Sequence, residues 1–263
     1  MRAPVGIFDS GLGGLSVVEP IRRLLPHESL VYVADSAHCP YGDKPAEFLR
    51  QRAVAICEFL IGEGCKAIVV ACNTATVATV GPLRERYAIP VVGLEPAVKP
   101  AALATRSGVI GVLATSHTLQ SEQYGLLIER YAAALKVLGE ACPGWVEAVE
   151  QGQLDGPMTE VLVERHVRPL LAGGADTLVL GCTHYPFLRP VIERIAGAAV
   201  TILDTGEPVA RQLRRRLAAT GRLAAAPAGI RHRFLTSGEP GAADAFVRRA
   251  WPEINVLETF APP

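Results

Sequence analysis

Short apolar segments of strand type recur along the whole chain, and stretches with helical periodicity separate them. This alternation favours β-α-β units, in which parallel strands are joined by right-handed crossovers. Helices cover both faces of such sheets, so their strands read as continuous apolar runs. The sequence therefore predicts an α/β fold, with strands at 5–8, 30–34, 67–71, 91–94, 109–113, 177–181 and 200–203. Residues 230–237 and 255–258 are expected to add edge strands.

An internal repeat links the two halves of this pattern. Residues 6–10 resemble residues 111–115, which lie 105 positions later, and the segment 69–74 resembles the segment 179–184, 110 positions later. Chance similarity between apolar strands is the alternative explanation. Two similar offsets in the same order predict two similar, pseudo-symmetric domains, each a mostly parallel sheet flanked by helices. The active site is expected in the cleft between them, at the carboxyl ends of the strands.

Prolines and glycines suggest where the chain passes from one domain to the other. Two prolines interrupt the pattern at residues 95–100, and a second crossing is expected at residues 204–208. The first domain would then be discontinuous, with residues 1–97 plus 208–263, and the second would span residues 98–207. The length of 263 residues suits two domains of roughly 100 to 200 residues each.

Composition excludes several classes of function. Lys plus Arg and Asp plus Glu both total 26, so net charge provides no reason to bind nucleic acid or an anionic membrane. No apolar stretch reaches the roughly 18 residues of a membrane helix, and the first residues lack a signal-peptide pattern. A cytoplasmic location is the expectation. None of the six cysteines forms a C-x-x-C pair, so no metal site is predicted. Oligomeric state stays open, with a homodimer among the possibilities.

The repeated segments each end in a cysteine followed by small polar residues. Cys72 leads into Asn73 and Thr74, and Cys182 leads into Thr183 and His184. A thiol has an ordinary pKa of about 8.5, which a helix N-terminus or a nearby base lowers. His184 can be that base or can hold a substrate carboxylate, and a satisfied core histidine is the alternative. Two matched thiols suit a reaction that removes a proton from one side of a carbon and returns one from the other, as a racemase does.

Two loops and the remaining cysteines complete the set of candidates. The turn at residues 9–14 lies between a strand and a helix, where free amides favour an anion such as a carboxylate; a plain capped turn is the alternative. Pro40 and Gly42 shape a loop that can present the Tyr41 hydroxyl and nearby amides to a ligand. Cys39 needs no catalytic role in such a loop. The other three cysteines are interpreted as packing residues, namely Cys57, Cys65 and Cys142.

At these residues the sequence resembles the glutamate racemases, the cofactor-independent enzymes that supply D-glutamate for bacterial peptidoglycan. The matching segments cover the chain from residue 6 to about residue 210. They are Phe-Asp-Ser-Gly-x-Gly-Gly at 8–14, Ala-Asp-Ser at 34–36, Pro-Tyr-Gly at 40–42, Ala-Cys-Asn-Thr-Ala at 71–75, Glu-Pro-Ala at 95–97, Gly-Cys-Thr-His-Tyr-Pro at 181–186 and Asp-Thr-Gly at 204–206.

The resemblance implies a role for each candidate. Cys72 and Cys182 would be the acid and base thiols on opposite faces of the bound amino acid, assisted by Asp9 and His184 respectively. A family glutamate near the second thiol is expected within residues 146–152, where Glu150 is favoured over Glu147. The amino and carboxylate groups of glutamate would be held by Asp9, Ser10, Tyr41, Gly42, Asn73, Thr74, Thr183 and His184. No cofactor is implied, and the sequence carries no sign of a pyridoxal phosphate site.

Three other functions remain open from the sequence. An aspartate or related amino-acid racemase would use the same two cysteines. A thiol hydrolase could use Cys182 as nucleophile and His184 as its base, but it leaves the Cys72 segment unexplained. A binding module without enzymatic activity could contact nucleic acid or protein through Arg211, Arg214, Arg215 and Arg216, although an exposed helix face is the favoured explanation of these arginines because the net charge is zero.

Overall fold

The computed structural model of the chain describes residues 3–226, 229–254 and 256–261. Contacts between Cα atoms divide the chain into two compact units, one within residues 1–94 and 206–263 and the other within residues 95–205. Each unit contains its own parallel sheet. The domain boundaries that the sequence predicts, after residues 97 and 207, stay a prediction.

The first unit contains a six-stranded sheet in the order β10-β9-β2-β1-β3-β4, and every strand pair in it is parallel. Its central strands are buried along their whole length, which explains why they read as continuous apolar runs. The strands are β1 (Val5–Asp9), β2 (Leu30–Ala34), β3 (Ala67–Val70), β4 (Val91–Gly93), β9 (His232–Thr236) and β10 (Leu257–Thr259).

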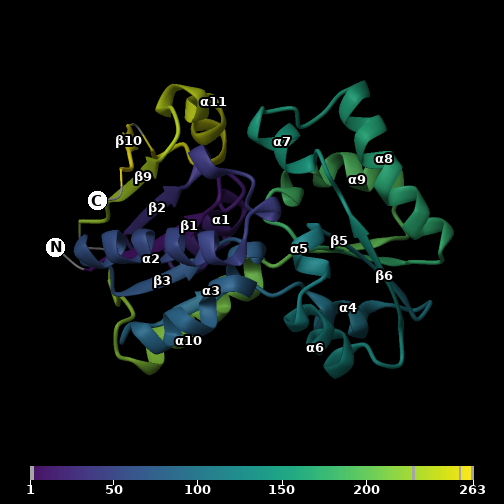
Figure 1. Cartoon of the computed structure of the whole chain (residues 1–263), viewed down its shortest axis with the longest axis horizontal. Helices are drawn as coiled ribbons and strands as arrows, with labels where there is room; N and C mark the ends of the chain where they lie inside the picture. The colour runs from purple at the N-terminus through teal and green to yellow at the C-terminus, as the bar shows by residue number, and fades with distance from the viewer. Residues whose placement is uncertain (1–2, 227–228, 255, 262–263) are drawn as a thin grey trace. The chain divides into compact units, whose positions relative to one another are not determined.

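Helices cover both faces of this sheet (Figure 1). The helices α2 and α3 pack together and share a buried cluster with Phe8, Val31 and Val70 of the strands. On the other side α1 packs against α10 and α11. The helices of this unit are α1 (Leu15–Leu24), α2 (Ala46–Gly62), α3 (Asn73–Arg86), α10 (Gly206–Ala219) and α11 (Pro240–Ala250).

The second unit contains a four-stranded parallel sheet in the order β6-β5-β7-β8. Its strands are β5 (Val109–Ala114), β6 (Lys136–Ala141), β7 (Thr177–Leu180) and β8 (Thr201–Leu203). Its helices are α4 (Val98–Ala104), α5 (Ser116–Leu119), α6 (Glu122–Tyr131), α7 (Trp145–Glu150), α8 (Pro157–Ala172) and α9 (Arg189–Ala196). Two parallel sheets flanked by helices confirm the predicted α/β class.

The two sheets repeat one topology. In the first unit β1 pairs with β2 on one side and with β3 on the other, and in the second β5 pairs with β6 and β7 in the same way. The chain therefore reverses its direction of winding between β1 and β3, and again between β5 and β7. Parallel sheets bind ligands at such reversal points, beyond the carboxyl ends of the strands.

The strand pattern predicted from the sequence needs two corrections. The strand β6 was not predicted, because its residues are only half-buried or exposed and form no continuous apolar run. The strand β9 was expected at an edge but lies inside the sheet, between β10 and β2. The strand β10 is at the edge, and Asn255 of the expected segment 255–258 lies outside the described residues.

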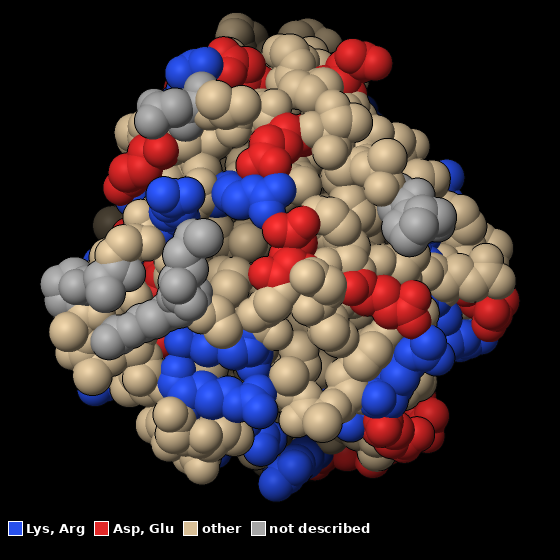
Figure 2. Space-filling model, turned by 90° about the vertical axis from the view of Figure 1, so that its left-hand side faces the viewer, with Lys and Arg blue, Asp and Glu red and all other residues tan. Residues whose placement is uncertain are grey.

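The surface of the first unit mixes charges of both signs. Figure 2 shows one face of the molecule, on which basic and acidic side chains lie next to one another. Arg233 pairs with both Glu63 and Glu258, and Arg22 pairs with Glu253. Among the described residues, no helix is both long and apolar enough to span a bilayer.

Candidate active site

The two repeated cysteines follow corresponding strands of the two sheets. Cys72 comes after β3 and Cys182 after β7, each at the carboxyl end of the strand next to the winding reversal. Both side chains are buried, with 6% and 7% of their surface exposed. Each unit thus places a thiol where its fold would bind a ligand. The surroundings of the two thiols differ.

Cys72 occupies the N-cap position of α3. Its backbone is extended, and its sulfur accepts a hydrogen bond from the Ala75 amide at 3.5 Å. The Ser10 hydroxyl lies 4.0 Å from the same sulfur, having reached it from the end of β1. An amide that donates to sulfur at a helix N-terminus stabilises the thiolate form, because the free N–H groups there carry partial positive charge.

Asp9 shapes the glycine-rich turn between β1 and α1. Its carboxylate accepts a hydrogen bond from the Gly14 amide at 2.7 Å, and the residue is fully buried. A Cβ atom at Gly14 would come within 2.6 Å of the Tyr32 hydroxyl, so this position requires glycine. The turn is therefore capped by Asp9, and it places Ser10 beside Cys72.

Asn73 and Thr74 begin α3 directly after the thiol, and each is only 3% exposed. Neither the nitrogen nor the oxygen of the Asn73 side chain has a hydrogen-bond partner within the described part of the chain. An unsatisfied buried amide group costs about 1 to 3 kcal/mol. A ligand that offers both a donor and an acceptor would remove that cost.

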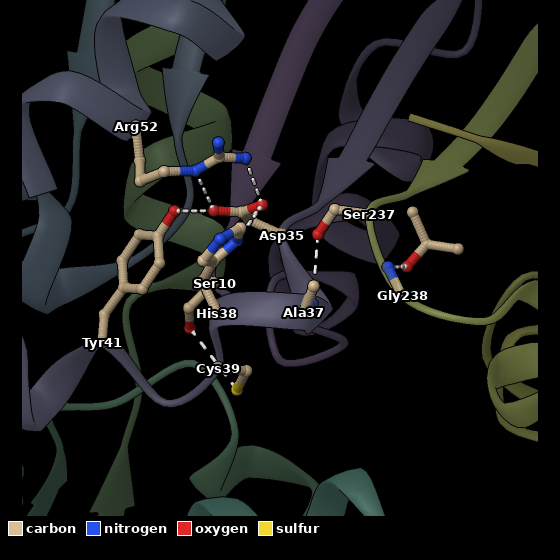
Figure 3. Close-up of polar contacts among 10 residues, drawn as sticks. Ser10, Asp35, Ala37, His38, Cys39, Tyr41, Arg52, Ser237 and Gly238 are labelled. Carbon is tan, nitrogen blue, oxygen red and sulfur yellow. Dashed lines mark hydrogen bonds and ion pairs between the residues drawn. The ribbon is translucent and has the colours of Figure 1, made fainter. Parts of the chain in front are cut away.

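The loop at residues 36–43 reaches the same place from the end of β2. The Cys39 sulfur lies 4.0 Å from the Ser10 hydroxyl (Figure 3). The Cys72 sulfur lies at the same distance from this hydroxyl, so two thiols flank one serine. The sequence predicts that the Tyr41 hydroxyl can contact a ligand. In the structure this hydroxyl donates to the Asp35 carboxylate at 2.6 Å. Burial and the neighbouring Asp35 charge raise the pKa of Tyr41, so it stays a neutral donor. Gly42 sits next to it in a short 3₁₀ turn.

In the second unit, Cys182 stands at the start of a chain of polar groups. Its sulfur lies 3.8 Å from Nδ1 of His184, and Nε2 of His184 lies 2.6 Å from a carboxylate oxygen of Glu150. His184 is 1% exposed, while the Glu150 side chain is 20% exposed. When the carboxylate accepts the Nε2 proton, Nδ1 of a neutral imidazole is left as a proton acceptor facing the sulfur.

An aromatic contact packs α7, the helix that carries Glu150, against the segment that follows His184. The ring of Trp145, at the start of α7, lies 4.7 Å from the Tyr185 ring in an edge-on arrangement, and both residues are fully buried. Because Tyr185 directly follows His184, this contact joins the start of α7 to the residue after the histidine, and Glu150 at the end of the helix contacts His184 itself. Glu147, the other candidate glutamate, is exposed on the same helix. Thr183, the residue between Cys182 and His184 in the sequence, is also buried.

The remaining buried cysteines lie in apolar surroundings. Burial raises the pKa of both Cys57 and Cys65 to about 12, and it raises the pKa of Cys142 as well, so all three stay protonated at neutral pH. Cys57 and Cys65 belong to the core cluster under α2. These environments suit their interpretation as packing residues.

The sequence did not predict some of the groups that the fold brings close to the loop at residues 36–43. Arg52 lies on α2, 17 residues after Asp35, yet its guanidinium contacts that carboxylate twice. Cys39 was set aside as a loop residue. The position of Asp35 at the carboxyl end of a predicted strand was a signal, but nothing in the sequence linked it to Arg52.

Comparison with known proteins adds to this geometry. The family model for Asp/Glu/Hydantoin racemase matches residues 13–213. A glutamate racemase from Ectopseudomonas mendocina is 55% identical over 239 residues, which is 90% of each chain. Among solved structures, glutamate racemase isoform RacE1 from Bacillus anthracis has a TM-score of 0.89 and 36% identity, covering 99% of this chain and 98% of that one. The Escherichia coli glutamate racemase in complex with L-glutamate has a TM-score of 0.89 and 32% identity, covering 99% of each chain.

The fold and the match over most of the chain define the class of enzyme as an isomerase. The chain belongs to the Asp/Glu/hydantoin racemase family, and the relatives that it matches over nearly its whole length are glutamate racemases.

Proposed function

We propose that the protein interconverts L-glutamate and D-glutamate without a cofactor. The identity of about half of all residues to glutamate racemases supports this reaction, as do the related structures from Escherichia coli and Francisella tularensis, which contain L-glutamate and D-glutamate respectively. One observation carries the proposal. Each unit places a thiol at the carboxyl end of the corresponding strand of its sheet, β3 in the first unit and β7 in the second.

The chemistry requires two such groups. The α-proton of glutamate is very weakly acidic, because the neighbouring carboxylate disfavours further negative charge. Its removal needs a positioned base and stabilisation of the developing carbanion. Inversion then needs a proton from the opposite face. We assign these two roles to Cys72 and Cys182, one as thiolate and the other as thiol, with the assignment exchanged for the other enantiomer.

The groups beside each thiol suggest how its proton is handled. Cys72 has the amide of Ala75 and the hydroxyl of Ser10, which lower the cost of the thiolate. Cys182 has His184, which can accept the thiol proton at Nδ1 while Glu150 holds the other ring nitrogen. Asp9 would act on the first side through the turn that it caps. A base oriented by a third group is the usual way to activate a thiol.

We further propose that the buried polar groups around the thiols bind the charged groups of glutamate. The unsatisfied amide of Asn73 supports a direct contact with the substrate, because it lies one residue from Cys72. The contacts of Ser10, Tyr41, Gly42, Thr74 and Thr183 with glutamate, which the family resemblance implies, belong to the same proposal. Exclusion of water on binding would strengthen each of these hydrogen bonds.

The product would serve bacterial peptidoglycan, in which D-glutamate is a component, and we place the reaction in the cytoplasm. A homodimer is compatible with this reaction, and sedimentation equilibrium will decide between one and two copies.

Incubation with L-glutamate in heavy water tests the reaction. Optical rotation should decay while deuterium enters the α-position, and deuterium should appear first in the product enantiomer. Cys72→Ser and Cys182→Ser should each abolish racemisation without unfolding the protein. Cys57→Ala is the control, because Cys57 is also buried but lies within α2 and not at the carboxyl end of a strand. Near-full activity in either serine variant would refute the two-base scheme.

Two alternatives have distinct signatures. A panel of L-glutamate and L-aspartate separates the two racemase activities, and a clear preference for aspartate would replace our assignment. Nucleic-acid binding through α10 has less support, because Arg211 already pairs with Glu207 on the same helix. A salt-dependent shift of DNA by the protein would revive that possibility.

A further inference from the structure

The Asp35 carboxylate is a buried charge that the proposed reaction does not use. It lies at the end of β2, and its side chain has no exposed surface. A buried ion of this kind is tolerated only when opposite charge and hydrogen bonds compensate for lost hydration. The compensation here comes from several elements of the first unit, and their arrangement suggests what the charge does.

Arg52 supplies most of this compensation from α2. Its Nε lies 2.9 Å from one carboxylate oxygen of Asp35, and its second terminal nitrogen lies 2.7 Å from the other. This forked contact fixes the carboxylate in orientation as well as in position, which a single ammonium group would not do. The Arg52 side chain is itself 15% exposed, so solvent screens the pair only weakly.

Further contacts of Asp35 go to the loop at residues 36–43 and to Ser237. The Tyr41 hydroxyl donates to it at 2.6 Å, and Nδ1 of His38 lies 3.1 Å from it (Figure 3). The backbone amide of Ala37 donates to the hydroxyl of Ser237, which follows β9. The loop is therefore held to the ends of two neighbouring strands and, through Asp35, to α2.

The far side of this loop lies against the first thiol. Cys39 approaches the Ser10 hydroxyl at 4.0 Å, and Ser10 approaches Cys72 at the same distance. The loop also contains Tyr41 and Gly42, the residues expected to meet the substrate. Residues 41–43 also contact α3, on which Cys72 sits. A change in loop position would thus move groups around Ser10, while Cys72 keeps the hydrogen bond from the Ala75 amide of its own helix.

We propose that Arg52, acting through Asp35, is a positioning residue that sets the loop at residues 36–43 for substrate binding. This inference rests on the proposed function, since it takes the surroundings of Cys72 as half of the active site. A pair of apolar residues in place of Arg52 and Asp35 could support the fold equally well. The forked ion pair also fixes the orientation of the Asp35 carboxylate. Substrate binding depends on such orientation more than folding stability does.

The test compares two neighbouring arginines of α2. Arg52→Met should raise KM for L-glutamate by about tenfold or more while kcat falls by less than about threefold, because binding is lost and the thiols stay in place. Arg52→Lys keeps the positive charge but loses the forked contact with Asp35. Its KM should therefore lie between that of the wild type and that of Arg52→Met. Arg50→Met is the control, because Arg50 pairs with Glu47 on the exposed side of the same helix. Its KM should stay within about twofold of the wild type.

A second measurement does not depend on catalysis. Amide hydrogen exchange in peptides covering residues 36–43 should become at least about tenfold faster in Arg52→Met and stay unchanged in residues 95–205. A folded Arg52→Met protein with unchanged KM and unchanged exchange would overturn the inference, whatever its melting temperature. If Arg52→Met fails to fold, unchanged KM and exchange in Arg52→Lys would overturn it. A wild type without activity on glutamate would contradict the proposed function, and the exchange data would then decide the positioning role alone.

Discussion

His184 and Glu150 lie 34 residues apart in the chain, yet Nε2 of one is 2.6 Å from a carboxylate oxygen of the other. The contact joins the loop after β7 to the end of α7 within the second unit. It leaves Nδ1 as the ring nitrogen that faces Cys182, in line with the proposed role of His184 as the proton acceptor for that thiol. Beside Cys72 lie the Ala75 amide and the Ser10 hydroxyl, and Asp9 caps the turn that carries Ser10.

Glu150→Gln should lower kcat by about tenfold or more, because the amide cannot hold the imidazole in one tautomer or stabilise its protonated form. Steady-state rates measured from L-glutamate and from D-glutamate check this. Glu147→Gln provides the matched control on the same helix, since Glu147 is exposed. Equal rates in the two variants would remove Glu150 from the mechanism.

Asn73→Ala should separate binding from stability. The variant loses an amide that has no hydrogen-bond partner among the residues that the structure describes, so the melting temperature should stay the same or rise. The KM for glutamate should increase by about tenfold or more, because a substrate contact is lost. Thermal unfolding and steady-state kinetics on one preparation are sufficient. A lower melting temperature with unchanged KM would identify Asn73 as a structural residue.

Alkylation should distinguish the classes of cysteine. Since burial raises the pKa of Cys57 and Cys65 to about 12 and also raises that of Cys142, these thiols should not react with iodoacetamide at pH 8 in the folded protein. Peptide mass spectrometry after a short exposure will show which positions are modified, with urea-unfolded protein as the positive control. Rapid labelling of any of the three would contradict their interpretation as packing residues.

Stability should depend on Asp35 in acid. Burial alone would raise its pKa, but hydrogen bonds from Arg52, Tyr41 and Ser237 and the charge of Arg52 outweigh it, so the pKa is lowered. The unfolded chain, with an aspartate pKa of about 3.9, then binds protons before the folded one does. The stabilisation is complete above about pH 4 and is lost as the pH falls through the lower folded value.

Urea unfolding of the wild type and of Asp35→Asn between about pH 3 and pH 7 measures this dependence. The wild type should be the more stable protein at pH 7, and the difference should shrink as the pH falls below about 4. A difference that stays constant over this range would mean that the Asp35 charge does not contribute to folding.

Much of this protein could be predicted from the sequence, because the signals lie between neighbours in the chain. Continuous apolar runs predicted the buried strands, and the residues after two of them identified Cys72 and Cys182 as candidate thiols. The same local reasoning proposed His184 as a partner for Cys182, from which it is two residues distant in the chain and 3.8 Å in the structure.

Only the tertiary structure decided what depends on contacts between distant segments. The strand β6 owes its existence to pairing with β5, and β9 lies inside the sheet because β2 and β10 both pair with it. The contact of Arg52 with Asp35 is of the same kind. Hydrogen bonds and ion pairs of this sort require geometry, and geometry arises when the sheets form. Periodicity along a chain encodes which residues are buried, but it does not encode which buried residues meet.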